Sequence, residues 1–326
     1  RFISGSSPVF STGCKRRSLT PSRSTSGLYP YSPTPPVNGG VHSVVDDATH
    51  KAEVLIEALP FLKRFHHQFM IVKLGGEPIE NPEVLDRLLT DLVWLEQVGV
   101  SPILVHGGGA SITRAMEQAG LKPTFHQGRR ITDEATMQIV AREVERLNMH
   151  LVNRIIELGG AAIGMCPPRH QVVKGTIMDP ALGLVGQPTG VDRERIARYA
   201  TRGLIPVLPP LSVDVDGRLM NTNADDIALA VATGMNAEKL VFLSSVNGVL
   251  TNPKDPTTRI SSMTIAQVRK LVADGVIQGG MIPKVESCIS ALQAGVRKIH
   301  IIAAAMPHAL LLEIFTAEGV GTELLP

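Results

Sequence analysis

The stretch Phe69-Met70-Ile71-Val72-Lys73-Leu74-Gly75-Gly76 decides the fold predicted for this chain. Its first four residues form a continuous apolar run, typical of a strand buried on both faces of a sheet, and the Gly-Gly pair allows a turn into a helix-compatible stretch. Four more such runs occur at residues 101–105, 204–208, 240–243 and 298–302. Most intervals between them show helical periodicity. This alternation predicts the α/β class, with a mainly parallel sheet covered by helices on both faces and ligands beyond the carboxyl ends of its strands.

The bulk composition favours a small-molecule partner. The chain has 326 residues, and its 32 basic and 30 acidic residues leave a formal charge of +2. This balance argues against nucleic acid and anionic membranes as partners, and no apolar run is long enough to cross a bilayer. Cys14, Cys166 and Cys288 lie far apart without a CxxC pair. We therefore expect a reducing compartment, no disulfide framework and no protein-bound metal.

The N-terminal region divides into two predicted parts. Residues 1–45 form a leader that we expect to be disordered, because its first forty residues contain no Asp or Glu and are rich in Ser, Thr, Pro and Gly. The leader has the composition of an organellar transit peptide, but a spurious leader is an equal alternative, so the expected location is the cytoplasm or, alternatively, an organelle. Residues 46–68 form an N-terminal helix, with apolar residues at helical spacing and Pro60 expected to kink or interrupt it.

Two glycine loops follow predicted strands, at Gly75-Gly76 and at His106-Gly107-Gly108-Gly109. Without Cβ atoms, such loops can turn backbone N–H groups toward phosphate or carboxylate oxygens, although each could also be a simple tight turn. No GxxxxGK[ST] or GxGxxG motif is present, and the HGGG sequence lacks the GxSxG nucleophile of lipase-type hydrolases. The Gly- and Pro-rich residues 172–191 predict a hairpin or lid near the substrate.

Polar residues at three predicted helix starts are further candidates for ligand contacts. In Gly279-Gly280-Met281-Ile282-Pro283-Lys284 a lysine stands at a helix N-terminus, which opposes the helix dipole unless an anion is bound there. Arg129 and Arg130 precede a helix capped by Thr132 or Asp133, and one arginine is expected to bind a carboxylate. Solvated side chains are the alternative for both segments. In residues 221–226, Asp225 or Asp226 is a candidate cap, and the surplus of amides and carboxylates points to ligand contacts.

Together, the motifs KLGG, VHGGG, GRRITDE, NTNADDIA, GGMIPK and EGVGTEL occur in the order found in the amino acid kinase family, which the chain resembles from Met70 onward. The resemblance implies a three-layer αβα sandwich around a mainly parallel sheet, within a kinase domain at residues 69–326. Residues 69–210 would form the half that binds the acylamino acid, and residues 211–326 the half that binds ATP.

The resemblance also implies a role for each matching residue. The catalytic group would be two lysines that stabilise the transferring phosphoryl group and an aspartate that holds them: Lys73, Lys284 and Asp225. Substrate would be bound by Gly108, Gly109, Arg130 and Asn221, with Arg130 on the α-carboxylate and Asn221 near the acetamide. The nucleotide would be bound by Gly75, Gly76, Ser245, Asn247, Gly248, Gly279 and Gly280. Three segments depart from the family pattern. Ser244 to Gly248 replaces Thr-Asp-Val-x-Gly, and residues 165–170 lack a Gly-Lys-Asp-Gly-like turn. Glu77 follows the first Gly-Gly and is expected to point away from the phosphates or to meet Mg²⁺.

Within the family, the resemblance is strongest to the kinases that use ATP with Mg²⁺ to phosphorylate the γ-carboxylate of N-acetyl-L-glutamate in arginine biosynthesis. The alternatives are a sister kinase acting on acetylaminoadipate, aspartate, carbamate or UMP, and a catalytically silent arginine-sensing domain, although the matching Lys73, Asp225 and Lys284 argue against the second. Arginine inhibition is a hypothesis with His308, Glu318 and Gly319 as its candidate site. We expect a homo-oligomer, either a dimer or a hexamer joined by the N-terminal helix.

Overall fold

The computed structural model describes residues 41–246, 248–252, 255–278, 281–316 and 319–326. Residues 40–326 form one compact unit, and the predicted leader lies outside the described residues as far as residue 40. Helix α1 spans Val41–Phe65 and is continuous through Pro60, so the proline does not interrupt it. The helix thus includes residues 41–45, which had been assigned to the leader. The spacing of apolar residues predicts that a helix is present more reliably than it predicts the residues at which the helix begins and ends.

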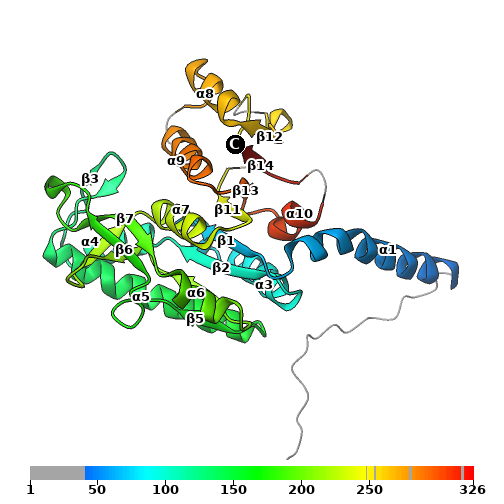
Figure 1. The fold of residues 1–326 in the computed structure, drawn as a ribbon, viewed down its shortest axis with the longest axis horizontal. Coiled ribbons are helices and arrows are strands. Elements are labelled where there is room, and N and C mark those ends of the chain that lie inside the picture. The colour runs from blue at the N-terminus through cyan, green and yellow to red at the C-terminus, as the bar shows by residue number, and fades with distance from the viewer. Residues whose placement is uncertain (1–40, 247, 253–254, 279–280, 317–318) are drawn as a thin grey trace, which may run out of the picture. The chain divides into compact units, whose positions relative to one another are not determined.

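The centre of the unit is an eight-stranded, mainly parallel sheet (Figure 1). In spatial order its strands are β12 (Ser262–Thr264), β14 (Thr322–Leu325), β13 (Ile299–Ala303), β11 (Lys239–Ser244), β1 (Phe69–Leu74), β2 (Ser101–His106), β8 (Ile205–Leu208) and β5 (Ala162–Gly164). All neighbouring pairs are parallel except β13 and β14. All five predicted apolar runs are strands of this sheet.

Side chains alternate between the two faces of the sheet and pack into two separate cores, because successive Cβ atoms of a strand point in opposite directions. In β1, Ile71 packs on one face, whereas Met70 and Val72 pack on the other. The first face is covered by α6 (Arg193–Ala200), α7 (Ala224–Met235), α8 (Ile265–Ala273) and α9 (Met281–Gln293). The second is covered by α3 (Pro82–Gln97), α5 (Glu134–Glu157) and α10 (Ala309–Phe315). The predicted three-layer αβα sandwich is therefore confirmed.

A smaller group of strands lies beside the main sheet. β6 (Val173–Ile177), β7 (Val185–Val191), β9 (Leu211–Val213) and β10 (Leu219–Thr222) close into a barrel. β6 and β7 are antiparallel neighbours, so the predicted hairpin in residues 172–191 is confirmed. The remaining elements are α2 (Gly76–Glu80), α4 (Gly109–Gln118), the β3–β4 hairpin (Phe125–His126 and Arg129–Arg130) and two 3₁₀ turns (Pro180–Leu182 and Pro256–Thr258).

The C-terminal end of α1 is anchored to the unit by aromatic and ionic contacts. Phe65 is 1% exposed and belongs to the core on the α3 face. Phe61 meets Phe315 of α10 edge to face at 6.5 Å, and the Arg64 guanidinium lies 3.2 Å from a carboxylate oxygen of Glu238. Since residues 49–57 of α1 are exposed, the helix is held to the sheet through its last turns, with Phe65 as the fully buried anchor.

We expect Phe65→Ala to lower the free energy of unfolding by about 3–5 kcal/mol, because it leaves a cavity where a buried ring was. Glu57→Ala, on the exposed surface of the same helix, should change it by less than about 0.5 kcal/mol. Urea denaturation of both variants measures the difference. Equal effects would show that α1 is not anchored by its last turn.

Candidate functional site

The carboxyl ends of β1, β2 and β11 bring the predicted site loops together at one edge of the sheet. Strand register pairs Leu74 with both His106 and Leu243, so all three strands end at the same level. The two glycine loops touch, because Gly107 N–H donates to the Leu74 carbonyl at 2.9 Å. Since β1 pairs with β11, the two predicted halves of the kinase domain share one continuous sheet.

Three charged side chains from distant parts of the chain meet at this edge. The Lys73 ammonium lies 2.7 Å from Oδ1 of Asp225, and the Lys284 ammonium lies 3.4 Å from Oδ2. These side chains are mostly buried, at 12%, 18% and 23% exposure for Lys73, Lys284 and Asp225. The Lys284 ammonium also lies 5.0 Å from the Phe242 ring centroid, a cation–π distance. The structure therefore unites the three residues predicted to be catalytic.

Helix α7 carries Asp225 in its first turn, but Asp225 does not cap the helix. The cap is Asn223, whose side chain accepts a hydrogen bond from Asp225 N–H. The expectation that Asp225 or Asp226 caps this helix was wrong. Asn caps a helix as well as Asp does, and Asn223 stands immediately before Ala224, the first residue of α7. Because its side chain does not cap the helix, the Asp225 carboxylate is available to pair with Lys73 and Lys284.

Burial disfavours the Asp225 carboxylate, but the charges of Lys73 and Lys284 outweigh burial and hold the pKa of this carboxyl below its usual range. Asp225 is therefore ionised at neutral pH. With two ammonium groups around one carboxylate, the cluster has a net positive charge.

A cavity of about 600 Å³ opens beside Lys73. Its wall includes all four residues predicted to bind substrate, namely Gly108, Gly109, Arg130 and Asn221, and also Gly76 and Glu77. Glu77 thus belongs to the wall of this cavity, and both expectations for it, pointing away from the phosphates or meeting Mg²⁺, stay predictions. Helix α4 begins at Gly109 in the same wall, so its free N–H groups add partial positive charge there.

Arg130 is a buried cation in the wall of this cavity. Its guanidinium donates to Thr113 Oγ1 at 2.8 Å and to the Gly109 carbonyl at 3.1 Å, and lies 4.7 Å from the Phe125 ring centroid. Burial lowers the pKa of Arg130. Within the described residues it has no acidic partner, so an anion in the cavity would compensate its charge.

Two residues near Arg130, namely Arg129 and Asn221, also have polar partners. The Arg129 guanidinium lies 2.7 Å from Asp226, an ion pair that joins the β3–β4 hairpin to α7. One of the two arginines was expected to bind a carboxylate. In the structure, Arg129 pairs with the Asp226 carboxylate, whereas Arg130 lies in the wall of the first cavity without an acidic partner among the described residues. Asn221 donates from Nδ2 to Thr132 Oγ1 at 3.0 Å. Asp133, as predicted, caps α5 by accepting a hydrogen bond from Thr136 N–H.

A second cavity, of about 500 Å³, lies near the start of α9. Its wall consists of Val246, residues 248–251, residues 275–278 and Met281. Of the residues predicted to bind the nucleotide, Gly248 is in this wall, and Ser245 precedes Val246 of the wall in sequence. Gly75 is instead the N-cap residue of α2, and Gly76, the first residue of that helix, lies in the wall of the first cavity. Asn247, Gly279 and Gly280 lie outside the described residues. Lys73 of the charged cluster lies in the wall of the first cavity, and Lys284 is one helical turn beyond Met281, which lies in the wall of the second.

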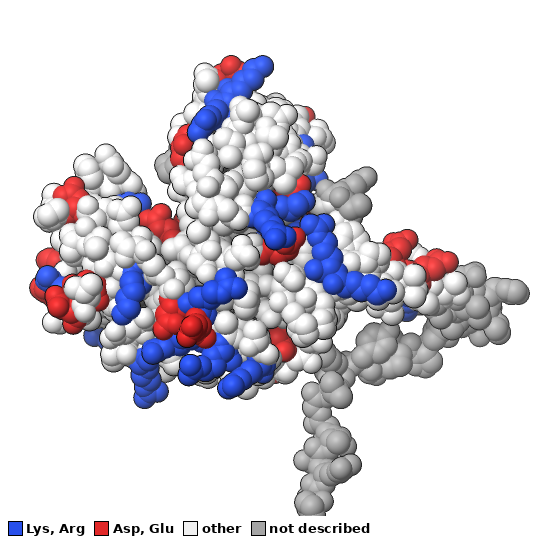
Figure 2. Space-filling model, viewed as in Figure 1, with Lys and Arg blue, Asp and Glu red and all other residues white. Residues whose placement is uncertain are grey.

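A third cavity, also of about 500 Å³, lies between α1 and the C-terminal strands. Its wall includes Arg64, Lys239, Arg259, Lys298, His300, Glu313, Gly319 and Glu323. Figure 2 shows Lys and Arg side chains gathered around acidic ones on this side of the molecule. Burial lowers the pKa of Lys239 to about 8.

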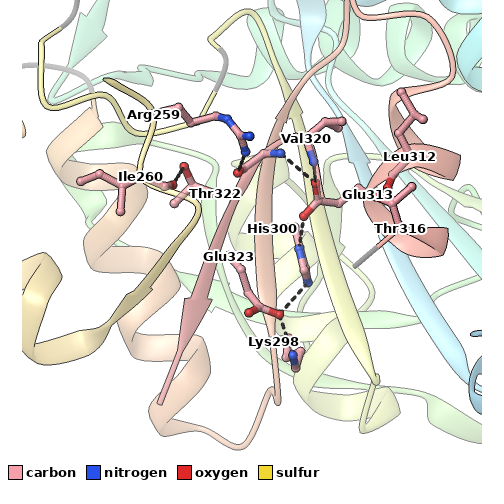
Figure 3. A network of polar contacts seen from close by, with 11 residues as sticks. Arg259, Ile260, Lys298, His300, Leu312, Glu313, Thr316, Val320, Thr322 and Glu323 are labelled. Atoms are coloured by element: carbon pink, nitrogen blue, oxygen red, sulfur yellow. Dashed lines mark hydrogen bonds and ion pairs between the residues drawn. The ribbon is translucent and has the colours of Figure 1, made fainter. Parts of the chain in front are cut away.

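A buried polar network stabilises this wall (Figure 3). Glu313 lies 2.5 Å from His300 Nδ1 and accepts hydrogen bonds from the N–H groups of Val320 and Gly321. Burial disfavours the Glu313 carboxylate, but these donors lower its pKa, while burial lowers the pKa of His300. Lys298 lies 2.6 Å from Glu323.

The predicted arginine-site residues are only partly united. Gly319 lies in the wall of the third cavity, and Glu318 lies outside the described residues. His308 is absent from that wall. It is the N-cap residue of α10, and its Nδ1 lies 2.7 Å from the buried carboxylate of Asp91. A sequence match to a region does not show which way a side chain points.

Two residues near the first cavity were missed by sequence reasoning. Phe125 stacks on Arg130, and Asn148 of α5 contacts His106. An aromatic residue shortly before the arginine pair was a weak signal for the first. No local pattern distinguishes Asn148 from other polar residues of a long helix.

Within the described residues there is no cluster of three or more His, Cys, Asp or Glu side chains arranged to hold a metal ion. In the same residues, no helix has the length and apolar character needed to span a membrane. Cys166 and Cys288 are free thiols, and burial raises the pKa of each to about 12.

The Asp225 pair predicts a pH dependence of stability. Since the native pKa of Asp225 is lowered, its contribution is present above the unfolded pKa near 3.9 and is lost as the pH falls through the native pKa. We expect Asp225→Asn to lower the free energy of unfolding by about 1–3 kcal/mol at pH 7, and the deficit to shrink below about pH 4. Urea denaturation at several pH values measures it, with the exposed Asp274→Asn as control. A deficit that grows toward low pH would contradict this assignment.

Comparison with known proteins places the fold and site in a family. The model of the amino acid kinase family matches residues 68–303. The acetylglutamate kinase of Methanococcus vannielii is 40% identical over 291 residues, which cover 86% of this chain and 99% of that protein. The acetylglutamate kinase of Synechococcus elongatus is 41% identical over 280 residues, which cover 85% of this chain and 93% of that protein.

A solved structure shares the fold at lower identity. The N-acetylglutamate synthase of Neisseria gonorrhoeae, complexed with coenzyme A and N-acetyl-glutamate, superposes with a TM-score of 0.74 at 21% identity. The match covers 84% of this chain and 63% of the synthase chain, and at this identity it shows the fold alone. With the family model matched over most of the sequence and relatives at about 40% identity over nearly their whole length, this chain belongs to the amino acid kinase family.

Proposed function

We propose that this protein transfers the γ-phosphoryl group of ATP to the γ-carboxylate of N-acetyl-L-glutamate, a step of arginine biosynthesis. The observation that carries the proposal is the cluster in which Asp225 holds together Lys73, in the wall of the first cavity, and Lys284, on the helix whose first residue Met281 lies in the wall of the second. The relatives named acetylglutamate kinase support the choice of substrate.

The chemistry needs positive charge rather than a base. A γ-carboxylate has a reference pKa of about 4.3, so the nucleophile is already ionised at neutral pH. Its approach to the γ-phosphate brings two anions together, and the transition state spreads negative charge over the transferring oxygens. Lys73 and Lys284 reach this point from the two halves of the domain, and glycine-loop N–H groups add donors without a conformational cost during the reaction.

The two substrates fit different cavities. In the first, the Arg130 guanidinium pairs with the α-carboxylate of the acyl amino acid, Asn221 lies near the acetamide, and the Gly108–Gly109 backbone contacts the reacting end. In the second, the apolar wall from Val246 to Met281 accepts the base of ATP. Mg²⁺ enters with the nucleotide and supplies charge neutralisation; the Glu77 carboxylate in the cavity wall is the kind of oxygen ligand the ion prefers.

A sister kinase acting on acetylaminoadipate remains the main alternative, because one methylene in a pocket is worth only about 1–3 kcal/mol of discrimination. A hydroxamate assay with ATP and N-acetylglutamate, N-acetylaminoadipate or aspartate distinguishes these cases. We expect the highest kcat/KM with N-acetylglutamate. Product from none of the three would favour the silent arginine-sensing domain instead.

In the same assay, Lys73→Ala and Lys284→Ala should each lower turnover by about 100-fold to 1000-fold, the usual cost of removing one preorganised charge partner. Both variants should keep the wild-type circular dichroism spectrum, because neither lysine belongs to the buried apolar core. The exposed Lys270→Ala, on α8, serves as the control and should keep full activity. Near-normal turnover in either active-site variant would refute the mechanism.

We further propose that L-arginine inhibits the enzyme by binding in the third cavity. The wall offers both charges that a free amino acid with a guanidinium side chain needs: Lys239, Arg259 and Lys298 for its carboxylate, and Glu323 for its guanidinium. Because α1 forms part of this wall through Phe61 and Arg64, ligand binding would bear directly on the position of the helix.

The same helix supports a proposal about assembly. Leu55 and Ile56 of α1 are 66% and 68% exposed, and the neighbouring Val54 and Leu59 are exposed too. An exposed apolar strip of this kind is suited to pairing with a second copy, which supports a homo-oligomer joined through α1, with a dimer as the smaller alternative.

We expect millimolar L-arginine to inhibit the wild-type enzyme and Glu323→Gln to raise the half-inhibitory concentration about tenfold, which corresponds to 1.4 kcal/mol. Glu194→Gln, exposed on α6, should leave it unchanged. Light scattering on the same samples reports the assembly. Absence of inhibition, together with a dimer in solution, would remove both regulatory proposals.

A further inference from the structure

His106 lies directly behind the first cavity, as the last residue of β2 and the first of the His-Gly-Gly-Gly loop. Its side chain is completely buried. It makes two polar contacts: Nδ1 lies 2.7 Å from the Gly107 carbonyl oxygen, and Nε2 lies 3.1 Å from the amide nitrogen of Asn148. The proposed mechanism gives this histidine no role. Burying an imidazole is costly unless its polar atoms have hydrogen-bond partners, and these two contacts supply them.

The surrounding hydrogen bonds determine which ring nitrogen carries the proton. The Asn148 amide nitrogen also donates to the Val207 carbonyl at 2.9 Å. A carbonyl only accepts, so the amide must turn its NH₂ group toward Val207, and its second N–H then points to His106 Nε2. Nε2 is therefore the acceptor and Nδ1 carries the proton, which it donates to the Gly107 carbonyl. Burial lowers the pKa of His106 to about 4, so the ring is neutral at physiological pH.

This arrangement fixes the peptide between Gly107 and Gly108. The Gly107 carbonyl of this peptide accepts from His106, and the preceding peptide is held because its Gly107 N–H donates to the Leu74 carbonyl of β1. In a trans peptide the carbonyl and the following N–H point in opposite directions. With its carbonyl turned back to His106, the peptide directs the Gly108 N–H away from the ring, and Gly107, Gly108 and Gly109 all line the first cavity.

The site of Asn148 is itself closely fitted. A Cβ atom at Gly164 of β5 would lie 2.3 Å from Asn148 Oδ1, so only glycine leaves room for the amide. Asn148 is 1% exposed. Strands β2, β5 and β8 thus each provide one wall or partner for this side chain: His106 and the Val207 carbonyl contact its amide nitrogen, and Gly164 makes room for its oxygen.

We propose that His106, oriented by Asn148, is a positioning residue that holds the Gly108 N–H in place to donate to the negative charge that develops during phosphoryl transfer. The proposal rests on the proposed kinase function. His106 does not touch substrate and does not transfer a proton; it acts through the glycine loop, in its neutral Nδ1–H form.

Two matched variants separate its two hydrogen bonds. His106→Asn can place an N–H donor where Nδ1 was and so keep the bond to Gly107, while losing the contact with Asn148. His106→Gln can place an acceptor where Nε2 was and so keep Asn148 satisfied, while losing the bond to Gly107. We expect kcat to fall by less than about 5-fold in His106→Asn and by about 100-fold in His106→Gln, with KM for ATP nearly unchanged in both, because a loosened loop misplaces a donor near the reacting atoms.

A spectroscopic measurement tests the proposal without relying on activity. In wild-type protein labelled with ¹⁵N-histidine, the His106 ring, assigned by its absence in His106→Asn, should show the neutral Nδ1–H tautomer from pH 6 to 9. An Nε2–H tautomer, equal kcat in the two variants, or a larger loss in His106→Asn would overturn the proposal, and thermal melting checks that both variants are folded. Failure of the wild-type enzyme to phosphorylate N-acetylglutamate would instead refute the proposed function and leave the tautomer result standing.

Discussion

The Asp225 carboxylate between two ammonium groups is the interaction on which the site depends. Lys73 and Lys284 would repel each other without it, and both are too buried for water to screen their charges fully. One carboxylate brings them together and still leaves a net positive charge. Because the lysine charges outweigh the effect of burial on the Asp225 pKa, the cluster stays ionised at neutral pH, and an anionic ligand is the natural fourth member.

The central sheet makes this cluster possible. β1 pairs with β2 on one side and with β11 on the other, so loops far apart in the sequence leave the sheet at the same edge. Lys73 is the penultimate residue of β1, and helices α7 and α9, which pack on the same face of the sheet, carry Asp225 and Lys284. The glycine loop after β2 is then positioned by backbone contact with β1 and by the buried ring of His106.

Predictions from local sequence patterns were correct where the physical cause of the structure acts over a few residues. Apolar runs become buried strands because both faces of the sheet are covered, and glycine pairs become turns because they tolerate close backbone approach. Where two residues can serve one local purpose, the pattern failed: Asn223, rather than either aspartate, caps α7. The role of His308 was also beyond a local pattern, since its partner Asp91 lies on α3, far earlier in the chain.

The sequence by itself determined the class of the fold, the strands and the residue types able to handle phosphate, because periodicity and glycine placement act over a few residues. Only the tertiary structure decided that Lys73, Asp225 and Lys284 touch, that Arg130 lies in a cavity wall without an acidic partner among the described residues, and that Asn148 sets the proton position on His106. Such pairings depend on how strands and helices pack across the whole unit, and side chains within hydrogen-bonding distance there are separated by dozens of residues in the sequence.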